Sequence, residues 1–68
     1  MLVNLELPKT ELINPFLRIE THKNGVTLTQ MIRFCNNTGF KQNARISIPV
    51  EVIDNLIIYL QQAKSELT

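Results

Sequence analysis

The end of the chain, from residue 44 onward, shows the clearest pattern of apolar and polar positions. Apolar and polar residues alternate from Ala44 to Ile48, which is typical of a half-buried β-strand. Pro49 ends this strand, and a helix is predicted to follow it to about Leu67, because proline is favoured in the first turn of a helix. The carboxylate of Glu51 supports this start, since the N-terminal end of a helix dipole is positive.

On a helical wheel, the apolar residues of this helix cover an arc of roughly 180° at about 100° per residue. The arc contains Val50, Val52, Ile53, Leu56, Ile57, Tyr59, Leu60, Ala63 and Leu67. This is wider than packing against one face of a sheet usually requires, so the partner of the spare surface is either the chain's own sheet or a second copy. Self-association is favoured, because a chain of 68 residues leaves roughly 40% of its unfolded surface exposed after folding.

Two stretches upstream also alternate. Residues 2–7 (LVNLEL) are predicted to form a first strand at a sheet edge, ended by Pro8, and residues 8–15 (PKTELINP) form a connection. Residues 16–22 (FLRIETH) and 26–36 (VTLTQMIRFCN) are predicted to form a hairpin. The sequence Asn24-Gly25 between them favours a two-residue turn, because both residues tolerate positive φ.

A turn at these two residues fixes which hairpin residues lie opposite each other. One side of the hairpin then pairs Leu17 with Ile32, Ile19 with Gln30 and Thr21 with Leu28. The other side pairs Phe16 with Arg33, Arg18 with Met31, Glu20 with Thr29 and His22 with Thr27. A slip by one residue would place arginines in the core, so the pattern favours this register.

Residues 37–43 (NTGFKQN) are predicted to be a loop, with Phe40 and Lys41 at its tip. The predicted fold is therefore one α+β domain over residues 1–68, in which a four-stranded antiparallel sheet is followed by one C-terminal helix. We expect the helix to cover one side of the sheet, which carries Leu17, Ile19, Leu28, Ile32, Ile46 and Ile48. The other side is expected to be open.

The amino-acid composition indicates the cellular compartment of the protein more clearly than it indicates a binding partner. The net charge is +1, from seven basic and six acidic side chains, so bulk charge favours no particular partner. The single Cys35 excludes an internal disulfide and a multi-cysteine zinc site, as is typical of proteins in a reducing compartment. There is no apolar run that could span a membrane and no signal-peptide pattern, so a cytoplasmic protein is expected.

The open side of the predicted sheet is rich in arginine. It holds three of the seven basic residues, with an aromatic ring and a thioether between them: Arg18, Arg33, Arg45, Phe16 and Met31. Guanidinium groups pair with phosphates, and phenylalanine stacks on any base, so this composition is typical of a sheet that binds single-stranded nucleic acid. The alternative is that the arginines are solvated or paired with Glu6 and Glu20 on the same side, and that the phenylalanine covers a small core.

The hairpin FLRIETHKNGVTLTQMIRF and the ending RISIPVEVIDNLIIYLQQA resemble a PUR repeat, the Pur-alpha type module related to the Whirly proteins and the positive-cofactor coactivators. In that family a four-stranded antiparallel sheet is followed by a helix. Two units intertwine through their helices and bind single-stranded DNA or RNA on the curved sheets. The resemblance covers about residues 15–67, and its most specific part is the step from an Arg-Ile-x-Ile-Pro strand into a long helix.

This resemblance implies a homodimer that binds single-stranded DNA or RNA with little dependence on sequence. The implied nucleic-acid contacts are Phe16, Arg18, Arg33 and Arg45, to which we add Met31 on the same side and Lys41 at the loop tip. The implied dimer interface is the spare helix surface, formed by Val52, Ile53, Leu56, Tyr59, Leu60 and Ala63.

Two other functions remain open. A protein-interaction module would accept a segment of a larger complex on the exposed sheet or its edge, which the near-neutral charge favours. A ribbon-helix-helix repressor of duplex DNA would match RISIP followed by a helix, although that fold needs a second helix.

No pattern in the sequence predicts catalysis. There is no Ser, His and Asp set, no Gly-rich phosphate loop and no cluster of carboxylates. His22 has no second ligand at metal-binding spacing, and Cys35 has no nearby histidine to lower its pKa. We therefore expect no enzymatic activity, no metal, no cofactor and no small-molecule substrate.

Overall fold

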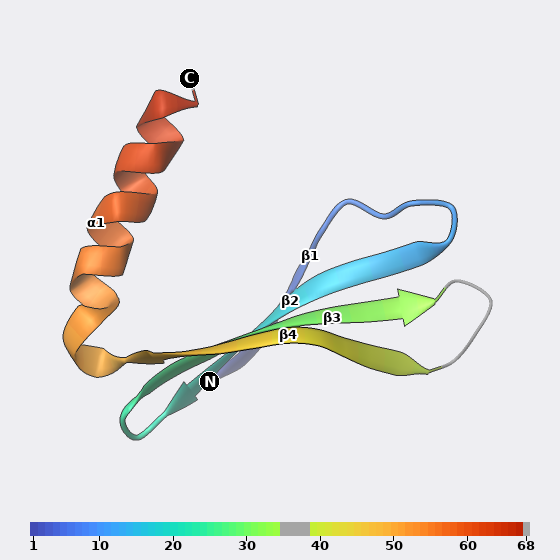
Figure 1. Ribbon diagram of the computed structural model, residues 1–68, viewed down its shortest axis with the longest axis horizontal. Helices are drawn as coiled ribbons and strands as arrows, with labels where there is room; N and C mark the ends of the chain where they lie inside the picture. Colours follow the sequence, from blue (N-terminus) through green and yellow to red (C-terminus); the bar gives the residue numbers. More distant parts are fainter. Residues whose placement is uncertain (35–38, 68) are drawn as a thin grey trace.

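The computed structural model describes residues 1–34 and 39–67. Its elements are β1 (Leu2–Glu6), β2 (Ile13–His22), β3 (Gly25–Phe34), β4 (Phe40–Pro49) and α1 (Val50–Glu66). The four strands form one antiparallel sheet in the order β1-β2-β3-β4, and α1 follows the last strand (Figure 1). The predicted α+β fold of a four-stranded antiparallel sheet and one C-terminal helix is confirmed, with the first strand at an edge as expected.

Two strands are longer than the sequence pattern predicted. Strand β2 begins at Ile13 and includes Pro15, which is tolerated near the start of the strand because the pairing of β2 with β1 begins only at Phe16. Strand β4 begins at Phe40, within the segment predicted to be a loop. Cys35 and the first residues of that predicted loop lie outside the described residues.

The hairpin between β2 and β3 turns at Lys23 and Asn24, because His22 lies opposite Gly25. The predicted turn at Asn24 and Gly25 is therefore wrong, and no described residue has a positive φ. The predicted pairs are displaced by two residues along the partner strand, so that Leu17 lies opposite Gln30 and Phe16 lies opposite Met31.

The assignment of residues to the two sides survives this displacement, because side chains alternate with a period of two along a strand. We call one side the arginine face, which carries Phe16, Arg18, Arg33 and Arg45. We call the other side the apolar face, which carries Leu17, Ile19, Leu28 and Ile46.

Gly25 serves the packing of β4 rather than the turn. A Cβ atom at this position would overlap the backbone carbonyl oxygen of Ile48 and would lie 3.1 Å from Cα of Pro49. The absent side chain therefore lets the end of β4 approach the hairpin closely. The adjoining helix is held there as well, since the Val50 amide donates a 2.9 Å hydrogen bond to the carbonyl of Asn24.

A β-bulge interrupts the pairing of β3 with β4. Gln30 pairs with Ala44 while Met31 pairs with Gln42, which leaves Asn43 as the extra residue. The Asn43 amide nitrogen donates a 3.0 Å hydrogen bond to Oε1 of Gln30. The extra residue reverses the alternation beyond it, so Phe40 lies on the arginine face and Lys41 on the apolar face.

Helix α1 runs away from the sheet instead of lying across it (Figure 1). Its contacts with the strands are limited to β3 and β4, and none of its residues is buried. The expectation that the helix covers the apolar face is therefore wrong for the single chain. On that face Val3, Leu5 and Ile46 are exposed.

The most buried side chains lie on the arginine face, which was expected to be open. Phe16 is 2% exposed and is the one buried hydrophobic residue among those described. Thr27 and Thr29 on β3 are 3% and 4% exposed. Small side chains become this buried where longer neighbours lean over them, so the small core of the chain is on the side that carries the arginines.

Candidate nucleic-acid interface

Beyond a row of His22, Gly25 and Pro49 next to the hairpin turn, the strand registers arrange the rest of the arginine face in four rows that run across the sheet, about 7 Å apart. From the hairpin end, the first row is Leu2, Glu20, Thr27 and Ser47, and the second is Asn4, Arg18, Thr29 and Arg45. The third row is Glu6, Phe16, Met31 and Gln42, and the fourth is Asn14, Arg33 and Phe40. Five of the six predicted nucleic-acid contacts thus share this face; Lys41 does not, because it lies opposite Ile32 on the apolar face.

Phe16 is the centre of a cation–π and aromatic cluster. The guanidinium carbon of Arg33 lies 4.6 Å from the ring centroid, and that of Arg18 lies 5.7 Å from it. The ring of Phe40 approaches edge-on, with the two centroids 6.0 Å apart and the planes at 80°. Phe16 is therefore a core residue that holds the two arginines, and its ring is too covered to stack on a base.

Arg33 is engaged within the chain. Its Nη2 forms an ion pair with Oε1 of Glu6, and its Nε donates a 3.3 Å hydrogen bond to the carbonyl of Asn14. The alternative that arginines of this face pair with its glutamates therefore holds for Arg33. Its positive charge is partly neutralised before any ligand arrives.

The second row is free to bind an anion. Arg18 donates through Nε to Oδ1 of Asn4 at 3.2 Å, which leaves its two terminal nitrogens available. Arg45 is exposed and has no hydrogen-bond or ion-pair partner within the described part of the chain. Thr29 on β3 lies between the two residues in the row, which are about 10 Å apart across the sheet, while the Arg18 guanidinium leans towards Asn4 on β1.

The Thr29 hydroxyl is itself unusual. The side chain is almost fully buried, yet its oxygen has no hydrogen-bond partner among residues 1–34 and 39–67. No side-chain oxygen or nitrogen sealed from solvent lacks a partner in that part of the chain, so this hydroxyl must be reachable from outside. The row therefore combines two arginines, which can donate to a phosphate, with a largely buried hydroxyl between them.

Phe40 is the aromatic ring that this face exposes, with 61% of its surface accessible. Sequence reasoning missed it as a contact, because the segment was taken for a loop and the bulge at Asn43 was not foreseen. Met31, in the third row, is partly buried between Phe16 and Gln42. Stacking on this face is thus available from Phe40 and not from Phe16.

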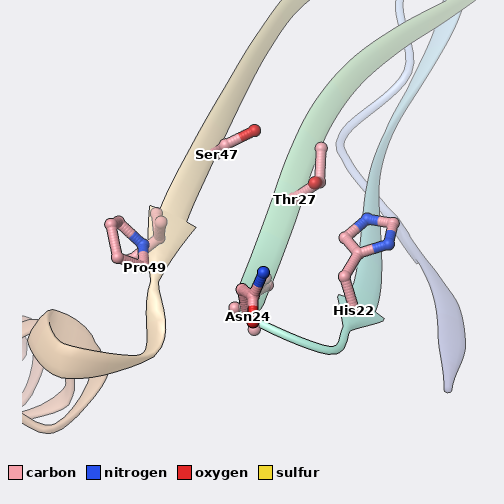
Figure 2. A pocket seen from close by; sticks show the side chains of 8 residues that line it. His22, Asn24, Thr27, Ser47 and Pro49 are labelled. Atoms are coloured by element: carbon pink, nitrogen blue, oxygen red, sulfur yellow. The ribbon is translucent and has the colours of Figure 1, made fainter.

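A shallow pocket of about 320 Å³ lies at the hairpin end of the sheet. Its lining residues are His22, Asn24, Gly25, Val26, Thr27, Ser47, Ile48 and Pro49. Figure 2 shows His22, Thr27 and Ser47 on three adjacent strands, with Asn24 and Pro49 at the end. No pattern in the sequence predicted this pocket, because it depends on the close approach of β4 to Gly25.

The predicted interface residues of α1 leave apolar surface available. Val52, Tyr59 and Leu60 are 45%, 66% and 59% exposed. Ala63 is exposed as well, while Ile53 and Leu56 are half-buried. A cleft of about 450 Å³ separates the helix from β4, lined by Ile46, Ile48, Val52, Asn55, Leu56 and Tyr59.

Comparisons with protein-family models, with curated proteins and with solved structures return no match for this chain. Within the described residues, no group of three histidine or acidic side chains is placed to hold a metal ion. No helix among the described residues has the length and apolar character that crossing a membrane requires.

Proposed function

We propose that this chain binds single-stranded nucleic acid, DNA or RNA, on the arginine face, as a homodimer and with little dependence on sequence. The observation that carries the proposal is the second row, in which Arg18 and Arg45 lie on either side of Thr29 and keep guanidinium nitrogens without a partner among the described residues. A backbone phosphate that lies along this row would receive donors from Arg45 and from the terminal nitrogens of Arg18. Contacts of this kind supply most of the affinity of sequence-independent binding.

Bases of the strand would stack on Phe40, which is exposed two rows away. Aromatic stacking tolerates any base, because every base has a π-face. In this arrangement the buried ring of Phe16 does not contact the ligand, and it positions the guanidinium groups of Arg18 and Arg33, which lie over it. Arg33 adds positive potential that Glu6 partly neutralises, and Met31 adds apolar surface.

The second copy is supported by the amount of surface that a single chain leaves exposed. The accessible area is 5637 Å², which exceeds by roughly 1,300 Å² the area typical of a monomeric protein of 7.8 kDa. Stable interfaces bury about 800 Å² per partner, so the excess is enough for a dimer. The apolar face and α1 are the surfaces that a second copy would cover.

The test is a titration of fluorescently labelled 20-nucleotide single strands with the protein, followed by anisotropy at several salt concentrations. We expect binding at low salt that weakens as salt rises, with a slope of about −0.7 per phosphate contact in the logarithmic plot. The double substitution Arg18→Ala and Arg45→Ala is expected to abolish binding while the circular dichroism spectrum stays unchanged. A matched control removes the same charge elsewhere, with Lys9→Ala and Lys64→Ala, and is expected to bind nearly as the parent does. Equal losses in the two double variants would contradict the proposal.

A protein-interaction function is the second candidate, because β4 is an outer strand whose residues are all exposed except Ile48. Its free backbone groups could pair with an extended segment of another protein. Absence of oligonucleotide binding in the same titration, together with salt-independent capture of a partner, would favour it. A ribbon-helix-helix repressor has less support, since the described residues contain a single helix.

A further inference from the structure

The hairpin-end pocket adjoins the proposed phosphate position. Thr27 and Ser47, which line it, lie in the first row and are one row, or about 7 Å, from Thr29 and Arg45. A strand whose phosphate sits on the second row would therefore bring its next sugar or base to this pocket. The pocket and the arginine row form one continuous surface.

The polar groups of the pocket are available for a ligand. Thr27 is 3% exposed, and its hydroxyl has no hydrogen-bond partner among the described residues. Since no sealed side-chain oxygen in that part of the chain lacks a partner, this hydroxyl must open to the outside, and the pocket is the space that it borders. Ser47 and His22 face the same space from the neighbouring strands (Figure 2).

The exposed lining of the pocket is mostly apolar, and its few polar side chains suit the hydroxyl groups of a sugar. His22 provides the one ring among the lining residues, and no guanidinium lines the pocket, so a base could not be held between two stacking surfaces there. Hydroxyl groups of serine and threonine can donate and accept a hydrogen bond, which matches the 2′-hydroxyl of ribose. A volume of about 320 Å³ is at the lower end for ligand pockets, as expected for one sugar with its attached groups.

We propose that the hairpin-end pocket binds the ribose next to the phosphate held by Arg18 and Arg45, and that the protein therefore prefers single-stranded RNA to single-stranded DNA. This inference rests on the proposed function. The pocket is too shallow to hold a free sugar tightly, but the neighbouring phosphate contact raises the local concentration of the ribose. Deoxyribose would leave the Thr27 hydroxyl without its new partner.

The experiment compares labelled 12-nucleotide oligo(U) and oligo(dU), which carry the same base and differ only at the 2′ position. Oligo(U) is expected to bind roughly tenfold more tightly, the effect of one or two hydrogen bonds. The double variant Thr27→Val and Ser47→Ala is expected to bind oligo(U) as weakly as oligo(dU), with its affinity for oligo(dU) unchanged. Arg45→Ala is the matched control and should weaken both ligands while keeping their ratio.

Each outcome decides the matter. Equal affinity of the parent protein for the two ligands would overturn the ribose inference and leave the proposed function standing. A preference for oligo(U) that persists in the double variant would also overturn the ribose inference and leave the proposed function standing. Binding of neither ligand would overturn the proposed function together with this inference. If Thr27→Val perturbs folding by circular dichroism, the single variant Ser47→Ala, at an exposed position, must still reduce the preference.

Discussion

At the scale of single residues, Phe16 shows that the face of a side chain and its burial are decided by different interactions. Its face follows from strand alternation and could be predicted from sequence. Its burial depends on Arg33, 17 positions away in the chain, and on Phe40, which a bulge brings to the same face. No local pattern contains that information, which explains why a stacking role and a core role both remained open.

Substitutions at the two phenylalanines should therefore have opposite effects. Phe16→Ala is expected to lower the free energy of unfolding by about 3–5 kcal/mol, because it removes a fully buried ring. Phe40→Ala, at a position 61% exposed, is expected to cost only about 0.5–1.5 kcal/mol, the effect of losing its edge-on contact with Phe16. It should instead weaken binding of single strands by about 1–3 kcal/mol, the effect of one stacked base. Chemical denaturation and anisotropy titrations measure the two effects, and a reversed pattern would show that Phe16 is the ligand contact.

At the scale of elements, the strands and the helix could be predicted, because apolar residues recur every two positions in a strand and about every 3.6 positions in a helix. The hairpin turn and the bulge could not be predicted in this way. The position of the turn and the bulge at Asn43 depend on how the strands pair. In both places, the local sequence is compatible with more than one pairing. The shift of two residues in the hairpin kept both faces. The single extra residue in β4 reversed them, and exchanged Lys41 for Phe40 on the arginine face.

Helix α1 should depend on a partner for its stability. An isolated helix of 17 residues is marginal in water, and α1 has no buried residue within the chain. Leu60→Glu, in the centre of the apolar arc, is expected to reduce the helical signal at 222 nm and to prevent association. Gln62→Glu adds the same charge on the polar side of the helix and should leave both unchanged. A fully helical Leu60→Glu monomer would show that α1 is stable without a second copy.

At the scale of the whole molecule, the single chain is more extended than a self-sufficient domain. Its radius of gyration is 14.1 Å, whereas a compact domain of 68 residues has roughly 11 Å. The difference arises from α1, which projects away from the sheet (Figure 1). The width of the apolar arc indicated spare surface from sequence alone, but the direction of the helix could not be read from it.

A folded dimer predicts that stability depends on protein concentration. We expect the melting temperature to rise as concentration rises, because association favours the folded state by mass action. Sedimentation equilibrium should give a mass near twice 7.8 kDa at concentrations where the protein is fully folded. A melting temperature that stays constant over a hundredfold range, with the mass of one chain, would contradict the dimer.

The hairpin-end pocket and helix α1, which carries the proposed dimer interface, meet where β4 approaches Gly25 closely. Pro49 borders the hairpin-end pocket and also immediately precedes α1, while Gly25 leaves room for the backbone between them. A methyl group at position 25 would push this backbone outward, and both the shape of the pocket and the direction of the helix would change together. The proposed ligand site and the proposed dimer interface therefore share a single steric requirement, and a substitution at this corner would alter both.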